Sequence, residues 1–206
     1  MTMSVLENLL IDKITKKINY FFSIYPVHDK SDYILVPDED FYNLSLEKQA
    51  NLLIIKLRLD YKRVFIAESA YGYAGIFGAS GKQFTEEILT VGVNTKNYNK
   101  IIQSAILCHE MTHYFLKKYE NTLKRDDYFG FSVHGEQDTE ILSYCLGLGK
   151  VMLNGFCEDY MSGHKLKSKY NITGQALIFN LVNSVLDISE EEKKKCLSKT
   201  ALTYIQ

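Results

Sequence analysis

The first part of the chain shows helical patterns of apolar residues. Between residues 4 and 22, apolar side chains recur at helical spacing with charges between them, which predicts an amphipathic helix packed on the body of the protein. Pro26 and Pro37 indicate an irregular or extended segment after it. A second helix is expected over residues 46 to 59, with Ser45 as its N-cap.

Three short apolar runs follow and predict a sheet. Arg63 to Ala67 and Glu87 to Val93 have strand-like composition, and Tyr73 to Phe77, which lies between glycines, is a weaker candidate. Three such runs so close along the chain predict a small, mainly antiparallel sheet. The run from Tyr73 to Phe77 suits a short edge strand, whose unpaired backbone groups could bind an extended peptide.

Helical patterns dominate the second half of the chain. Residues 97 to 118 are apolar almost all round, which places this helix in a core rather than on a surface. A polar loop is expected over residues 119 to 135. The pattern is helical again from 136 to about 153, where Asn154 and Gly155 predict the end of the helix.

The C-terminal part completes a single predicted unit. Residues 174 to 186 form a further apolar helix, and Ser189 with Glu192 is a capping box that opens the last one. No repeat, low-complexity tract or linker divides the sequence, so we expect one α+β domain, mostly helical, with the sheet directly before the central helix. Its expected parts are N-terminal helices over 1–60, the sheet over 61–96, a pair of facing helices over 97–153 and C-terminal helices over 154–206.

Composition excludes several classes of partner. The chain carries 24 Lys and Arg against 25 Asp and Glu, a net charge of −1, which gives no electrostatic basis for binding nucleic acid or an anionic membrane. No stretch approaches the roughly 18 apolar residues of a membrane span, and the N-terminus lacks the unbroken apolar region of a signal peptide. The four cysteines are widely spaced and form no Cys-x-x-Cys pair, which favours a reducing compartment. We therefore expect a soluble protein of the cytoplasm.

A complete His-Glu-x-x-His motif lies inside the apolar helix, at residues 109–113. His109 and His113 are four apart and project from one helical face, which is the spacing at which one zinc ion binds both imidazoles. Glu110 lies beside that face, where it is expected to act as a general base on water activated by zinc. Chance would produce the motif in roughly one sequence in a hundred of this composition. A core helix with hydrogen-bonded histidines and no metal is the alternative.

A catalytic zinc takes three protein ligands, so a third must come from elsewhere in the chain. The longer metzincin motif is excluded because Tyr119 stands where it requires histidine. Ligand type and helical facing favour Glu136. His134, Asp138 and Glu140 remain alternatives, since imidazole and carboxylate groups both bind zinc.

The segment around these acids resembles a known group of enzymes. Gly-Glu-Gln-Asp-Thr-Glu at 135–140 is similar to the Asn-Glu-x-x-Ser-Asp segment of gluzincins, the thermolysin-like zinc metallopeptidases, and the resemblance covers residues 108 to about 155. It implies that Glu136 is the third zinc ligand and that Glu140 orients a ligand histidine. It also implies the order of sheet, active-site helix and glutamate helix found in small intracellular members of the group. Two departures are Gly135 in place of asparagine and glutamate in place of aspartate at 140.

The sequence therefore predicts a zinc metallopeptidase that hydrolyses a peptide or protein substrate. His109, His113 and Glu136 would bind Zn²⁺, and Glu110 would move the proton. Two other functions fit the same residues: a zinc-containing regulatory or binding module without turnover, and a metal-free interaction protein with an accidental motif. The residues considered for stabilising the oxyanion are His134, His164, Tyr160 and Tyr170.

Overall fold

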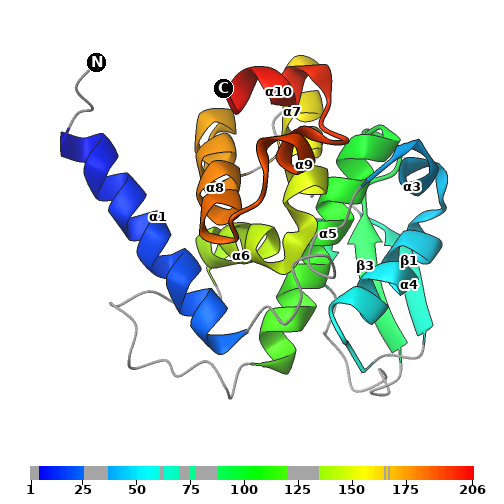
Figure 1. The fold of residues 1–206 in the computed structure, drawn as a ribbon. Helices are drawn as coiled ribbons and strands as arrows, with labels where there is room; N and C mark the ends of the chain where they lie inside the picture. Colours follow the sequence, from blue (N-terminus) through cyan, green and yellow to red (C-terminus); the bar gives the residue numbers. More distant parts are fainter. Residues whose placement is uncertain are drawn as a thin grey trace.

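The computed structural model describes residues 5–25, 37–60, 63–69, 75–77, 88–119, 135–164, 166 and 168–206. Figure 1 shows the arrangement of its helices and strands. The helical elements are α1 (Val5–Ile24), α3 (Glu39–Asn43), α4 (Leu46–Lys56), α5 (Lys100–Lys118), α6 (Glu136–Ser143), η2 (Tyr144–Leu148), α7 (Gly149–Met161), α8 (Ile172–Val185), α9 (Glu190–Lys194) and α10 (Lys199–Tyr204). The strands are β1 (Arg63–Glu68), β2 (Gly75–Phe77) and β3 (Ile88–Val93). The π-helical turn η2 connects α6 to α7.

The sheet is mixed, with strand order β1-β3-β2. β1 pairs with β3 in parallel, from Arg63 opposite Ile88 to Glu68 opposite Val93, and the shorter β2 pairs with β3 in the antiparallel direction. The prediction of a mainly antiparallel sheet is therefore wrong, because the longer pairing is parallel. A parallel pair needs a crossover of about a dozen residues or more, and residues 69–87, which include β2, are long enough to supply it.

Helix α5 runs through the middle of the molecule, with the sheet on one side and α7 on the other (Figure 1). Asn99 caps its N-terminus by accepting from the N–H groups of Ile101 and Ile102. The Tyr114 hydroxyl donates to the Thr90 carbonyl and ties α5 to β3. The fully buried apolar residues that these two elements place in the core include Leu89, Val91, Val93, Ile102, Leu107, Cys108 and Met111. The expected core position of this helix is confirmed.

The helical segment that begins at Glu136 is kinked and longer than predicted. Gly147, inside η2, has a φ of 78°, which glycine adopts without the steric cost that a side chain would bring. Asn154 and Gly155 do not end the helix, because both lie inside α7. A Cβ on Gly155 would lie 2.2 Å from the Cβ of Ala105, so this glycine allows α5 and α7 to pack closely.

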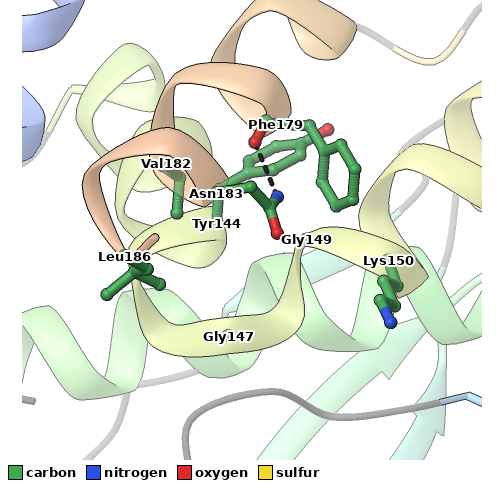
Figure 2. Close-up of a pocket in the computed structure, with 8 residues that line it drawn as sticks. All are labelled: Tyr144, Gly147, Gly149, Lys150, Phe179, Val182, Asn183 and Leu186. Carbon is green, nitrogen blue, oxygen red and sulfur yellow. Dashed lines mark hydrogen bonds between the residues drawn. The ribbon is translucent and has the colours of Figure 1, made fainter. Parts of the chain in front are cut away.

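A small cavity lies at the kink (Figure 2). Tyr144 packs edge-on against Phe179 there, with ring centroids 6.4 Å apart, and Asn183 donates to the Phe179 carbonyl. The cavity measures about 20 Å³, room for about one water molecule. It is much too small for a peptide.

Helix α1 follows the predicted amphipathic pattern only in its second half. Ile14, Ile18 and Phe21 are buried, whereas Leu9 is 60% exposed. Figure 1 shows the N-terminal half of α1 extending past the other helices.

The four cysteines are all free thiols. Cys108, Cys145 and Cys157 are buried and behave as small apolar core residues, and Cys196 is partly exposed. Within the described ranges, none of the helices has the length and apolar character needed to cross a membrane.

Candidate metal centre

The two histidines of the motif and Glu136 come together where α5 faces the first turn of α6. The Nε2 atoms of His109 and His113 are 3.2 Å apart. One carboxylate oxygen of Glu136 lies 2.9 Å from His109 Nε2, and the other lies 3.7 Å from His113 Nε2. The three side chains therefore direct one nitrogen or oxygen each at a common point, with all three atoms within 4.8 Å of one another.

This arrangement fits a tetrahedral zinc ion. Zn–N bonds of about 2.0–2.1 Å place two ligand atoms of a tetrahedron about 3.3 Å apart, which is close to the separation of the two imidazole nitrogens. The histidine side chains are 17–18% exposed and the Glu136 side chain is 49% exposed. The cluster is thus largely buried on the histidine side and exposed on the glutamate side.

The electrostatics of the cluster shift the pKa values of His109 and Glu136. Burial opposes protonation of His109, but the hydrogen bond to Glu136 and the nearby carboxylates outweigh it and raise the pKa of His109. The hydrogen bond with His109 lowers the pKa of Glu136, although burial acts in the opposite direction. The pKa of His109 rises because of the carboxylates around it, and the pKa of Glu136 falls mainly because of the two imidazoles, so opposite charges stabilise each other in the cluster.

Glu110 lies beside the cluster and outside it. Its side chain is buried, and it is not among the three converging groups. Burial raises the pKa of Glu110 to about 7, with His109 acting in the opposite direction and Glu136 adding to the rise. A carboxyl group with a pKa near the working pH is well suited to accept and return a proton.

Thr139 is a residue that the sequence analysis missed. Its Oγ1 lies 3.3 Å from His113 Nδ1, and its hydroxyl donates to the Gly135 carbonyl at 3.4 Å, so Oγ1 can accept from an Nδ1–H. That tautomer leaves Nε2 of His113 with a lone pair facing the cluster, which a metal ligand needs. Thr139 lies three residues after Glu136 and therefore on the same helical face, and this spacing could have identified it from the sequence.

The other acidic candidates for the third ligand are engaged elsewhere. The Asp138 carboxylate contacts Lys17 of α1. The Glu140 carboxylate accepts from the Ser168 hydroxyl, the Lys169 backbone N–H and the Gln175 amide at 2.8–3.0 Å. Burial raises the pKa of Glu140, and these donors partly counter the rise. Glu140 therefore holds residues 168–175 against α6. Its negative charge contributes to the raised pKa of His109, although the described structure shows no hydrogen bond between the two side chains.

The four oxyanion candidates fall in different places. His164 is exposed and contacts the ring of Tyr98, which precedes α5. Tyr160 is exposed beside Tyr204. Neither belongs to the cluster of His109, His113 and Glu136. Tyr170 belongs to the segment held by Glu140, and burial raises its pKa to about 12. His134 lies outside the described residues, as does most of the loop expected over 119–135.

No protein-family model, curated protein or solved structure matches the chain. The resemblance to gluzincins therefore rests on the motif residues.

The third ligand can be tested by substitution. Glu136→Ala is expected to weaken zinc binding more than about 100-fold, because it removes a converging carboxylate. Glu140→Ala should weaken it less than Glu136→Ala, because Glu140 acts on His109 through its charge alone within the described structure. His134→Ala should have the smallest effect of the three. Competition with a chelator of known affinity measures each variant. A His134→Ala variant with the greatest loss would make His134 the ligand and end the gluzincin assignment.

Proposed function

We propose that the protein is a zinc metallopeptidase of gluzincin type. The observation that carries the proposal is the convergence of His109, His113 and Glu136 from two helices, with the buried carboxyl of Glu110 beside them. His109 and His113 come from one complete motif, and Glu136 comes from the helix that the resemblance designates. Cytoplasmic location and a peptide substrate are part of the same proposal.

The roles of the residues follow from their positions. His109, His113 and Glu136 would hold zinc, which when bound acts as a Lewis acid on water and on the scissile carbonyl. Glu110 accepts a proton as water adds to the carbonyl carbon, and it returns that proton to the amine as the C–N bond breaks. Thr139 keeps His113 in the tautomer that can bind metal.

The edge strand β2 offers a place for an extended substrate. β2 pairs with β3 on one side only within the described residues, and it contacts α5, the helix that carries the motif. A peptide that added to the open side of β2 would gain backbone hydrogen bonds.

Hydrolysis of a peptide pool tests the function. The zinc-loaded protein is expected to cleave members of a defined peptide mixture, as seen by mass spectrometry, and to lose this activity when zinc is removed and regain it when zinc is restored. Zinc binding without cleavage of any peptide would instead favour the regulatory or binding module.

Proline substitution in β2 tests how the substrate binds. Ile76→Pro and Phe77→Pro remove successive N–H groups, which on a strand point to opposite sides, so one variant affects the free edge and the other affects the pairing with β3. The edge variant is expected to raise the Michaelis constant for peptides about 10-fold without loss of zinc. Unchanged peptide kinetics in both variants, when folded, would rule out pairing of the substrate with β2.

A further inference from the structure

Lys17 is a lysine buried in the second half of α1. It contacts the Asp138 carboxylate of α6, and each side chain is no more than 3% exposed, although the two residues are 121 positions apart in the sequence. Lysine and aspartate are almost never fully buried unless they are paired. The ion pair therefore fixes α1 against the first turn of α6, which Figure 1 shows beside it.

Asp138 lies two positions after Glu136, so the ion pair with Lys17 acts on the turn of α6 that also carries Glu136. Residues two apart are separated by about 200° around a helix, so the two carboxylates leave α6 on opposite sides. Glu136 faces the histidines of α5, and Asp138 faces Lys17 of α1. The first turn of α6 is thus clamped between α5 and α1.

Local sequence does little to fix this turn. Gly135 occupies the N-cap and has no side chain to hold the first N–H groups. Glu140, in the second turn, is held separately by Ser168, Lys169 and Gln175. The tertiary contact made by Lys17 therefore acts on the same turn that carries Glu136.

We propose that Lys17 is a positioning residue of the metal centre: its buried ion pair with Asp138 holds the first turn of α6 where Glu136 meets His109 and His113. The inference rests on the proposed zinc site and adds α1 to it. Docking of α1 and binding of zinc then stabilise each other, because thermodynamic coupling between two sites is reciprocal. Any interaction that drew α1 away from α6 would lower the affinity for zinc.

A pair of matched lysine variants tests the proposal. Lys150 is also buried, and its ammonium contacts Glu192 at 3.2 Å, which ties α7 to α9 rather than to the metal ligands. Both Lys17→Met and Lys150→Met are expected to lower the melting temperature of the metal-free protein. Only Lys17→Met should weaken zinc binding, by about 10-fold or more, with Lys150→Met within about twofold of wild type. Lys17→Arg, which keeps the charge, should lose less affinity than Lys17→Met.

A measurement on the wild-type protein complements the variants and covers the case in which Lys17→Met does not fold. Amide hydrogen exchange in residues 14–21 is expected to slow on addition of zinc by more than exchange in α10, which reports the general gain in stability. Equal slowing in both segments, or wild-type zinc affinity in Lys17→Met, would overturn the positioning role while leaving the zinc site standing. A wild-type protein that binds no zinc would overturn the proposed function and this inference with it.

Discussion

Glu110→Gln is expected to keep its zinc and to hydrolyse peptides at least about 100-fold more slowly than the wild type, a loss of about 2.7 kcal/mol in transition-state stabilisation. The amide has nearly the same shape as the carboxylate but accepts no proton from water, and Glu110 is not among the converging ligand atoms. Single-turnover assays on zinc-loaded protein measure the rate, and elemental analysis measures the metal.

A matched control keeps this prediction specific. Glu191→Gln makes the same chemical change at an exposed position in α9 and should leave both the rate and the zinc content unchanged. If Glu110→Gln loses its zinc, Glu110 is a ligand, and the proposal that it acts as a general base without binding the metal is wrong. If it retains full activity, the proton is taken by another group.

His109→Ala and His113→Ala are each expected to abolish the stabilisation that zinc gives the folded protein. Free zinc at about 1,000 times its dissociation constant stabilises a folded protein by about 4 kcal/mol. In a domain of this size that raises the melting temperature by about 8–16 °C. Removing either imidazole leaves two ligands, so the shift should disappear in both variants.

The remaining histidine of known position supplies the control for these variants. His164 is exposed, packs against Tyr98, which precedes α5, and is not part of the cluster, so His164→Ala should show the full zinc-induced shift. Thermal unfolding with and without zinc measures all three variants. A zinc-induced shift that survives in both His109→Ala and His113→Ala would mean that the metal binds elsewhere.

Local signals predicted the elements well. Ser45 and Ser189 accept from the backbone N–H groups of Lys48 and Glu192, as their N-cap positions indicated. Strands were expected close to where β1 and β3 lie, and the motif helix differs from its expected range only at its start. Caps and apolar periodicity depend on neighbours along the chain, so the sequence alone contains this information.

Features that depend on distant residues were not predicted. The parallel pairing joins β1 and β3, which are distant along the chain, so local sequence does not decide it. Gly155 resembles a helix stop in sequence, and only its contact with Ala105 of α5 shows that it serves close packing. The kink falls instead at Gly147, inside a pattern that predicted a continuous helix.

In the candidate site too, the features set by neighbours along the chain were predicted and those set by distant residues were not. The spacing of His109 and His113 indicated a shared ligand face, and the structure brings Glu136 to it. The environment of Glu140 could not be foreseen, because its donors come from residues 168–175, far along the chain. Lys17 was missed for the same reason, since a lysine in an amphipathic helix is normally solvent-exposed and only the folded chain places it against Asp138.

The most direct test of the central claim is the zinc content of the protein after loading with zinc and removal of loosely bound metal. We expect about one zinc per chain in the wild type, and none in a variant in which His109 and His113 are both alanine. A wild-type protein without stoichiometric zinc, or a double variant that retains it, would show that these histidines do not form a zinc site.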